Sequence, residues 1–298
     1  MPETREILVI SGKGGTGKTS LTAAFAHLAG EAVLCDLDVD APDLHLILAP
    51  RPWRREEFYS GHEAVIDPAA CTGCGTCAQM CRYGAVVAEG EVFRVEPLAC
   101  EGCKVCVEFC PEGAIAFPQR HCGRWYLSQS RFGPVVHAQL FAGAENSGRL
   151  VTLLRQQARE LAQRQGRELI LCDGTPGIGC PVISSLSGVE LAVVVTEPTP
   201  SGRHDLERVV ELCRHFRVPA AVVINKCDLS EEHSRGIEDF CTTRGLELVA
   251  RLPFDPVVVE AMVEGRSVTE HAPHGPLARQ VARAWGRICE LARVPRAA

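Results

Sequence analysis

A glycine-rich segment close to the N-terminus has the residue types that hold a phosphate group. It reads Gly12-Lys13-Gly14-Gly15-Thr16-Gly17-Lys18-Thr19-Ser20. An apolar run at residues 7–10 precedes it and a helical pattern at residues 20–29 follows it, which predicts a strand, a loop and a helix. In this context the loop N–H groups and the helix N-terminus converge on an anion. The segment therefore predicts a nucleoside triphosphate site, with Lys18 on the β- and γ-phosphates and Thr19 on Mg²⁺.

A second group of reactive side chains is a cluster of cysteines. The chain has 16 cysteines, and half of them follow the spacing Cys71-x2-Cys74-x2-Cys77-x3-Cys81 and Cys100-x2-Cys103-x2-Cys106-x3-Cys110. The second set repeats the first after 29 residues, and Gly73 maps onto Gly102 by the same interval. Zinc sites usually combine two C-x2-C pairs, whereas three closely spaced cysteines and a distant fourth are typical of 4Fe–4S clusters. We expect two such clusters in this segment.

Carboxylates follow two predicted strands. Asp173 ends the apolar run at residues 168–173 and fits a carboxylate that assists Mg²⁺. The run at residues 32–36 leads into an acidic cluster, which consists of Asp36, Asp38, Asp40 and Asp43. A solvated acidic loop is the alternative interpretation for Asp40 and Asp43. Because ligands bind at the carboxyl ends of parallel strands, we expect these side chains to lie at the edge that holds the glycine loop.

Most of the remaining chain alternates between apolar runs and helical patterns. Further strands are expected at residues 191–196, 220–225 and 246–250, a less distinct one at 51–60, and a hairpin around Gly133. Helices are expected at residues 147–165, 203–216, 230–243, 257–264 and 276–292. This alternation predicts an α/β fold with a mostly parallel, doubly wound sheet. Its two parts, residues 1–60 and 119–298, flank the cysteine segment at residues 61–118.

Composition narrows the range of partners. The net charge is −6 and the aromatic content is 5%, so nothing favours nucleic acid as a ligand. No apolar run approaches the length of a membrane span. The first strand begins within a few residues of the N-terminus, which predicts a cytoplasmic protein without a signal peptide. The last helix is amphipathic, and we expect it to dock on the sheet rather than on a membrane.

The glycine loop resembles the deviant phosphate-binding loop of the ParA/MinD and nitrogenase iron-protein class. The resemblance lies in Lys13, which ordinary loops of this kind do not require. It implies ATP as the nucleotide and an active homodimer, or a heterodimer with a paralogue, in the ATP state. Lys13 would then reach the nucleotide of the partner subunit and add charge at the transition state. A solvated lysine at the rim of the loop is the alternative.

The same resemblance assigns roles to the strand ends. It implies that Asp38 orients the attacking water and that Asp36 lies in the outer shell of Mg²⁺. Asn225-Lys226-Cys227-Asp228 looks like a base-recognition motif, in which Asn225 would contact adenine. Leu252-Pro253-Phe254-Asp255 resembles the second adenine-side loop of the class, with Pro253 and Asp255 beside the base. An ordinary turn at the start of a helix is the alternative for this last segment.

The cysteine repeat resembles a bacterial two-cluster ferredoxin, an α+β domain. In that family each cluster takes three cysteines from one half of the repeat and the fourth from the other half. The resemblance thus implies one cluster on Cys71, Cys74, Cys77 and Cys110, and a second on Cys100, Cys103, Cys106 and Cys81. Arg82 stands where the ferredoxin pattern has a proline, which departs from the match beside the second cluster.

Taken as a whole, the chain resembles MinD-superfamily P-loop ATPases that contain an inserted ferredoxin domain, a group related to the Mrp class. Residues 145–151, 173–181 and 196–200 add to the resemblance. It implies an ATPase whose nucleotide cycle gates electron transfer, or iron–sulfur or metallocofactor delivery, to an acceptor protein. The alternative is a MinD-like positioning ATPase with structural or sensory clusters. Cys180, with Cys122 as a second candidate ligand, would be a further cluster site in the iron-protein manner. A small residue at a helix start is the simpler interpretation of Cys180.

Overall fold

The computed structural model describes residues 4–144 and 147–294. Contacts within the chain define two compact units. Unit 1 comprises residues 1–56, 125–139 and 147–298, and unit 2 comprises residues 57–124 and 140–146. The two predicted family segments at 173–181 and 196–200 lie in unit 1. The first two residues of the third segment, Glu145 and Asn146, lie outside the described residues.

The main sheet of the described chain has nine strands in the order β13-β12-β11-β1-β10-β2-β9-β8-β3. Their bounds are β1 (Arg5–Ser11), β2 (Val33–Asp36), β3 (Arg51–His62), β8 (Gln119–Ser130), β9 (Gly133–Leu140), β10 (Leu169–Pro176), β11 (Leu191–Thr196), β12 (Ala220–Asn225) and β13 (Glu247–Leu252). The strands from β13 to β9 pair in parallel. This confirms the predicted α/β fold with a mostly parallel sheet.

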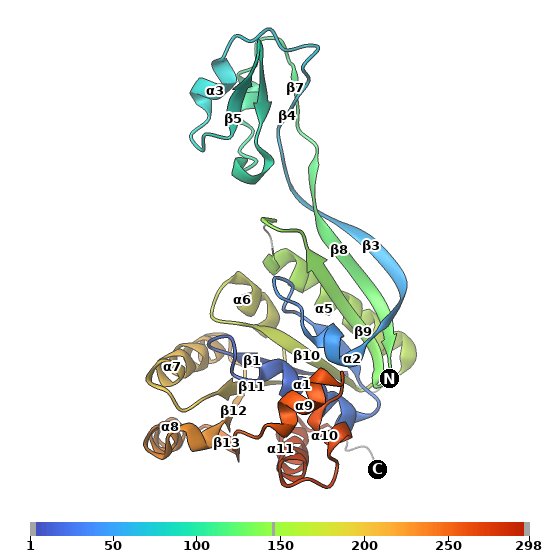
Figure 1. Cartoon of the computed structure of the whole chain (residues 1–298), viewed down its shortest axis with the longest axis vertical. Helices are drawn as coiled ribbons and strands as arrows, with labels where there is room; N and C mark the ends of the chain where they lie inside the picture. The colour runs from blue at the N-terminus through green and yellow to red at the C-terminus, as the bar shows by residue number, and fades with distance from the viewer. Residues whose placement is uncertain (1–3, 145–146, 295–298) are drawn as a thin grey trace. The chain divides into compact units, whose positions relative to one another are not determined.

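Helices cover both faces of this sheet (Figure 1). They are α1 (Lys18–Ala29), α2 (Leu44–Leu48), α5 (Ser147–Gln165), α6 (Cys180–Leu186), α7 (Pro200–His215), α8 (Glu231–Arg244), α9 (Val257–Val263), α10 (Val268–His271) and α11 (Pro276–Ala292). The central strand β1 is fully buried from Ile7 to Ile10. A strand with both faces covered needs apolar residues throughout, which is why β1 reads as a continuous apolar run.

The C-terminal helix α11 packs on the sheet, as the sequence predicted. Its apolar side, which includes Leu277, Val281 and Ile288, is buried in the same hydrophobic cluster as α1. Trp285 stacks on Phe25 with 5.3 Å between ring centroids. No helix among the described residues is long and apolar enough to span a membrane.

The structure differs from the sequence-based expectation at helices α2, α6 and α10, for which no range was expected, and at strand β8. Helix α10 was not predicted, because its four residues are too short to show a helical period. Its stability comes from a capping box, in which Ser267 and Glu270 satisfy each other's backbone N–H groups. Strand β8 also begins five residues before the predicted hairpin, at Gln119 rather than Arg124.

Unit 2 contains two small antiparallel sheets and two short helices. Its elements are β4 (Val65–Ile66), α3 (Thr76–Met80), β5 (Val86–Glu89), β6 (Val92–Val95), a 3-10 turn (Pro97–Ala99), α4 (Val105–Glu108) and β7 (Ile115–Ala116). β4 pairs with β7 and β5 with β6. The sequence repeat is visible in three dimensions, because α3 and β5 of the first half correspond to α4 and β7 of the second.

Unit 2 extends beyond residues 61–118, the boundaries that the sequence suggested. The additional residues come from the ends of β3 and β8 and from residues 140–146. Phe141 explains part of this extension. The centroids of its ring and of the His121 ring are 4.9 Å apart, and the guanidinium of Arg124 lies over the Phe141 ring. Cysteine spacing alone contains no information about these aromatic contacts.

Candidate functional site

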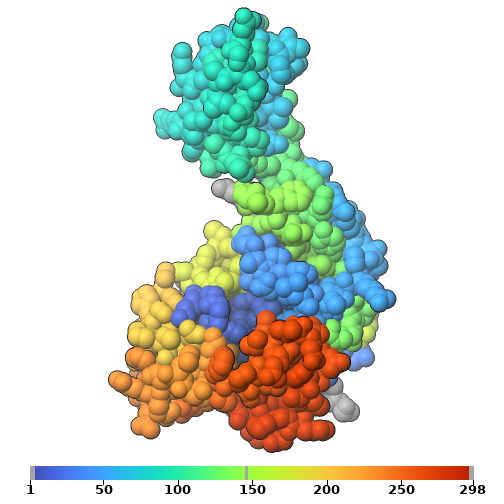
Figure 2. Space-filling model, in the orientation of Figure 1, coloured from blue at the N-terminus to red at the C-terminus, as the bar shows by residue number. Residues whose placement is uncertain are grey.

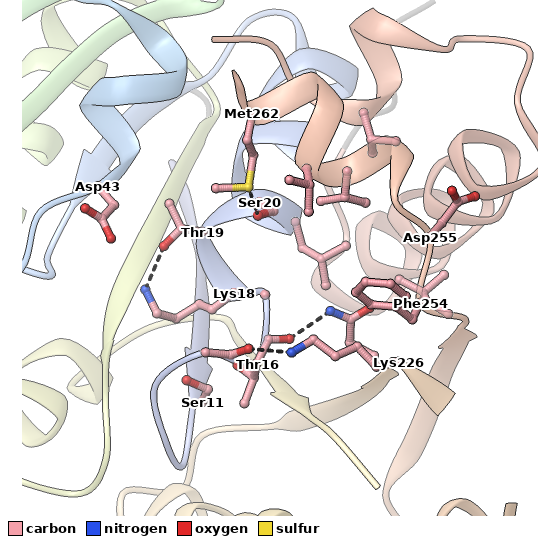
Figure 3. Close-up of a pocket in the computed structure, with 18 of the residues that line it drawn as sticks. Ser11, Thr16, Lys18, Thr19, Ser20, Asp43, Lys226, Phe254, Asp255 and Met262 are labelled. Carbon is pink, nitrogen blue, oxygen red and sulfur yellow. Dashed lines mark hydrogen bonds between the residues drawn. The ribbon is translucent and has the colours of Figure 1, made fainter. Parts of the chain in front are cut away.

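The glycine loop connects β1 to α1 and borders a cavity of about 500 Å³ in unit 1 (Figure 3). The other lining residues come from the ends of β1, β10 and β12, the segment after β2, the residue after β12 and the region from β13 to α11. Gly14 and Gly15 are exposed, and the dark blue N-terminal residues reach the surface of unit 1 in Figure 2. The loop therefore meets the cavity from a solvent-accessible side, where a nucleotide can enter.

A compact polar cluster lies at the start of α1. Nζ of Lys18 lies 3.0 Å from Oδ1 of Asp173, and the Thr19 hydroxyl donates to Oδ2 of Asp173 at 2.7 Å. The hydroxyl of Thr22, one helical turn after Lys18, donates to Oδ1 of the same carboxylate. Burial alone would lower the pKa of Lys18, but the nearby carboxylates outweigh it and raise that pKa. The lysine is therefore a fixed cation at neutral pH.

Two carboxylates from the segment after β2 complete this cluster. Asp38 Oδ2 lies 3.6 Å from Nζ of Lys18. Burial raises the pKa of Asp38 to about 6, against the opposing effect of the Lys18 charge. Asp36 is 1% exposed, and its Oδ2 has no hydrogen-bond partner among the described residues. A buried carboxylate oxygen without a donor is costly unless a cation approaches it, so this oxygen is suited to a metal or to its water shell.

Lys13 does not point into open solvent at the rim of the loop. Its ammonium group lies 2.7 Å from Oε1 of Glu197 and contacts the hydroxyls of Thr199 and Ser201. All three acceptors come from the segment between β11 and the first turn of α7. The structure therefore replaces the solvated lysine of the alternative interpretation with one that has three partners in its own chain.

The loop after β12 contacts the phosphate-binding loop directly. The side-chain amide of Asn225 donates to the Thr16 carbonyl at 2.8 Å, and Lys226 donates to the Gly15 carbonyl at 2.8 Å. Both bonds are drawn in Figure 3. Asp228 accepts a hydrogen bond from the backbone N–H of Phe254 at 2.6 Å. This bond ties the loop after β12 to the segment that contains Pro253.

Pro253 and Asp255 both line the cavity, together with the exposed ring of Phe254. Asp255 Oδ1 accepts a hydrogen bond from the N–H of Val257 at the start of α9. This is the helix-entry role that the sequence offered as an alternative. The residue therefore borders the cavity and supports a helix start as well.

In unit 2 the eight cysteines of the repeat separate into two cavities. The first is lined by Cys71, Cys74, Cys77 and Cys110, and the second by Cys81, Cys100, Cys103 and Cys106. Each cavity thus receives three cysteines from one half of the repeat and one from the other. These are the two sets that the ferredoxin resemblance implied.

Four cysteines line each of these two cavities. Among the described residues, no group of three or more His, Cys, Asp or Glu side chains is placed to hold a single metal ion.

The backbone also repeats at these cavities. Gly73 and Gly102 both have positive φ, 69° and 63°. A Cβ on Gly73 would lie 2.2 Å from the carbonyl oxygen of Glu91, and one on Gly102 would lie 2.4 Å from that of His62. Each cysteine loop therefore needs glycine at its second position after the first cysteine, which explains why the repeat includes this residue.

Comparison with known proteins decides the family. The family model for the CobQ/CobB/MinD/ParA nucleotide binding domain matches residues 7–268. The chain belongs to this family. A protein of Methanocaldococcus jannaschii that is described as uncharacterized is 35% identical over 225 residues, which cover 74% of this chain and 78% of that protein. The iron-sulfur cluster carrier protein of Aquifex aeolicus is 27% identical over 124 residues, 38% of this chain and 34% of that protein.

Solved structures agree on the fold. MinD of Pyrococcus horikoshii in complex with Mg-ADP has a TM-score of 0.58 at 19% identity, over 97% of both chains. An ATP complex of McdA from Cyanothece has a TM-score of 0.58 at 12% identity, over the full length of both chains. Family and fold together make this chain a P-loop ATPase of the MinD/ParA class.

The cysteines outside the repeat differ in accessibility. Cys180 is exposed at the start of α6 in this MinD/ParA-class chain. Cys122 is fully buried, and its thiol donates to the carbonyl of Ser60 at 3.2 Å. A surface cluster needs accessible thiolates, so Cys122 is not a suitable second ligand beside Cys180. The remaining ones are Cys35, Cys172, Cys213, Cys241 and Cys289, which are buried, and Cys227, which is partly buried.

Sequence reasoning missed two residues that contact side chains of the nucleotide site without lining its cavity. Glu197 contacts both Lys13 and Lys226, although the sequence suggested it only as part of a family-like stretch. Thr22 contacts Asp173, and its position four residues after Lys18 places it on the same face of α1. The helical period could have indicated Thr22, whereas no local pattern indicates Glu197.

Proposed function

We propose that this chain hydrolyses ATP with Mg²⁺ and carries two 4Fe–4S clusters in unit 2. Its nucleotide cycle would gate electron transfer, or delivery of an iron–sulfur cluster or another metallocofactor, to an acceptor protein. The observation that carries this proposal is the sorting of eight cysteines into two four-cysteine cavities in a MinD/ParA-class ATPase. The relative from Aquifex aeolicus, named an iron-sulfur cluster carrier, is consistent with it.

Adenine is the proposed base because the acidic residue that would read guanine is already engaged. In a guanine site the aspartate of an N-K-x-D motif accepts hydrogen bonds from the base. Here Asp228 accepts a hydrogen bond from the backbone N–H of Phe254 instead. Lys226 is also bound, to the Gly15 carbonyl and to Glu197. Asn225, Pro253 and Asp255 would then border the adenine ring.

The oxygen ligands fit Mg²⁺, which favours hydroxyl, carboxylate and water oxygens. Thr19 and Asp173 would hold the ion, and Asp36 would hold its water shell. The ion would neutralise charge on the β- and γ-phosphates. Thr19 and Asp173 already contact each other through a hydrogen bond, so the two side chains that would hold the ion lie side by side.

The chain's own residues account for positioning and charge. Lys18 and the loop N–H groups would bind the γ-phosphate, and Asp38 would orient the attacking water. Lys13 of a second subunit would add positive charge as the transition state forms. An ATP-bound homodimer, or a heterodimer with a paralogue, follows from this role of Lys13.

The cavities of unit 2 fit 4Fe–4S clusters on chemical grounds. Thiolates are the usual ligands of these clusters, and four of them line each cavity. Partly buried apolar side chains, including Phe93 and Val107, pack around the cysteines. Such surroundings would shield one side of each cluster from water, while Cys74 and Cys103 are exposed. An inserted ferredoxin-like domain is therefore the proposed identity of this unit.

The decisive experiment uses anaerobically purified protein. We expect about eight iron and eight sulfide per chain from two 4Fe–4S clusters. The reduction potentials of the clusters and their transfer to an apo-acceptor are then measured with and without ATP. ATP should change at least one of these in the wild-type chain and neither in Lys18→Ala, the matched variant without nucleotide binding. Clusters that are insensitive to ATP, with ATP-dependent recruitment to DNA or vesicles, would support the positioning ATPase instead.

A further inference from the structure

The segment after β11 holds Lys13 within its own subunit. Nζ of Lys13 lies 2.7 Å from Oε1 of Glu197, 3.1 Å from the Thr199 hydroxyl and 3.0 Å from the Ser201 hydroxyl. An ammonium group has three N–H donors, and these acceptors account for all three. A phosphate oxygen of another subunit could bind Lys13 only by replacing one or more of them.

Glu197 is shared with a second lysine. Its Oε2 lies 3.2 Å from Nζ of Lys226, which also donates to the carbonyl of Gly15. The side chain of Glu197 is only 14% exposed. Burial alone would raise the pKa of Glu197, but the two lysines outweigh it and hold that pKa below its ordinary value. The carboxylate is therefore ionised at neutral pH and joins the end of β11 to the phosphate-binding loop.

We propose that Glu197 is a latch that keeps Lys13 in its own subunit and opposes ATP-dependent dimerisation until it releases the lysine. This inference depends on the role proposed above for Lys13 in a partner's nucleotide site. When Lys13 leaves, Lys226 remains on the carboxylate, so the release does not strand a buried charge. Glu197 is a positioning residue, because it contacts Lys13 and Lys226 and does not itself line the cavity beside the glycine loop.

The latch would keep the shared active site of the dimer from forming in the absence of ATP. Because Lys13 already has three hydrogen-bond acceptors, exchanging them for a poorly positioned ligand would bring little gain in binding free energy. Only a nucleotide with enough negative charge, held at the partner's phosphate-binding loop, offers better contacts. The monomer would thus be favoured with ADP and the dimer with ATP.

The first variant is Glu197→Gln, which keeps the shape of the side chain and removes its charge. Loss of a charge-assisted contact of about 1.4 kcal/mol corresponds to a tenfold change. Because both subunits of a homodimer release Lys13, we expect ATP-dependent dimers to form at about a hundredfold lower protein concentration. Sedimentation with a non-hydrolysable ATP analogue measures the dimer. Affinity of the monomer for a fluorescent ATP analogue should stay within about twofold, because Glu197 is not a ligand of the nucleotide.

A second variant tests the same idea without disturbing Lys226. Ser201→Ala removes one neutral acceptor from Lys13 and leaves the Glu197–Lys226 contact intact. The expected shift is in the same direction and smaller, about threefold. Glu207→Gln is the matched control, since this carboxylate lies on α7 and, among the described residues, pairs with Arg203 of the adjacent turn. It should not alter dimerisation.

Unchanged or weaker dimerisation in both Glu197→Gln and Ser201→Ala would overturn the latch. If Glu197→Gln does not fold, the result for Ser201→Ala decides alone.

Lys13→Ala distinguishes failure of the latch from failure of the proposed function. If Lys13→Ala dimerises and hydrolyses ATP normally, the role of Lys13 across subunits is wrong and the latch fails with it. If only Lys13→Ala is impaired and the other two variants match wild type, the latch alone is wrong.

Discussion

Asp38 and Asp40 lie two residues apart in the same acidic segment but differ in their contacts. Asp38 faces the Lys18 ammonium at 3.6 Å, whereas Asp40 is exposed. If Asp38 orients the attacking water, Asp38→Asn should reduce the hydrolysis rate by about 100-fold and leave ATP binding nearly unchanged. Phosphate release and nucleotide affinity measure the two effects.

The matched control for this prediction is Asp40→Asn. It removes a carboxylate from the same segment, so it accounts for any general effect of lowered negative charge. Its hydrolysis rate should stay within about twofold of wild type, since no contact of Asp40 with the nucleotide cavity is expected. Equal losses in both variants would refute the assignment of the water to Asp38.

His137 gives the fold a predictable dependence on pH. Burial lowers the pKa of His137 to about 4, with a smaller contribution from nearby His45. The ordinary value is about 6.5, so between pH 6.5 and pH 4 the unfolded chain binds a proton that the folded chain does not. Stability is therefore present above pH 6.5 and is lost as the pH falls through this window. We expect a loss of about 2 kcal/mol between pH 7 and pH 4.5 from this residue.

Urea unfolding of the wild-type chain and His137→Gln at several pH values measures this effect. The variant should be less sensitive to pH than wild type in this window. His204→Gln changes an exposed histidine and should leave the pH dependence unchanged. A pH dependence in His137→Gln equal to that of wild type would contradict the prediction.

Sequence identified the residues of this site where spacing along one loop or strand fixes position. Lys18, Thr19 and Asp173 meet because a phosphate-binding loop and an adjacent parallel strand end at the same edge of the sheet. Glu197 was missed because its contact with Lys13 joins segments that are far apart in the chain. Such a contact depends on loop geometry, which no periodic pattern encodes.

At the scale of elements, α3 and α4 set the crossed arrangement of the cysteines. Each short helix carries the third cysteine of its set, and the chain that leaves it carries the fourth to the other cavity. Cys81→Ser and Cys110→Ser should therefore each remove one cluster and leave about half of the iron. The cluster lost should differ between the two variants.

Iron analysis and electron paramagnetic resonance of the reduced protein distinguish these outcomes. The two variants should retain different signals, each present in the wild-type spectrum. Cys227→Ser is the control, because this cysteine lies in unit 1, away from the repeat. Loss of the same signal in both repeat variants would show that the ligands are not crossed.

The sequence predicted the strands and helices of unit 1 well because most have a clear apolar period. It missed α10, whose capping box depends on a backbone turn. It also underestimated β8, since residues 119–123 mix polar and apolar types at the point where the chain leaves unit 2. The composition of residues 119–123 therefore shows neither the apolar pattern of the strands of unit 1 nor the cysteine spacing of unit 2.

At the scale of the whole molecule, α11 stabilises the ATPase fold through its apolar face. Trp285 is 6% exposed and stacks on Phe25 of α1. Trp285→Ala should lower the free energy of unfolding by about 3 kcal/mol, because it removes a large buried side chain. Arg283 lies on the exposed side of the same helix. Arg283→Ala should lower the free energy of unfolding by less than about 0.5 kcal/mol.

Thermal or urea unfolding of the chain measures these changes. The unfolding is monitored by far-UV circular dichroism, a signal that does not depend on the tryptophan that is replaced. Binding of the wild-type chain to anionic vesicles offers a separate check. Vesicle binding should be weak, since the apolar face of α11 is already buried in the core. Strong ATP-dependent binding that Trp285→Ala abolishes would mean that the helix leaves the sheet.

Strand β3 forms one edge of the main sheet and carries features that protect it. Its exposed first half contains Pro52, which has no N–H for a ladder, and the charged residues Arg54 and Glu56. Proline and charged side chains oppose the addition of a strand from another molecule. This edge therefore opposes the joining of two subunits by a continuous sheet, and the concentrated protein should resist fibre formation through it.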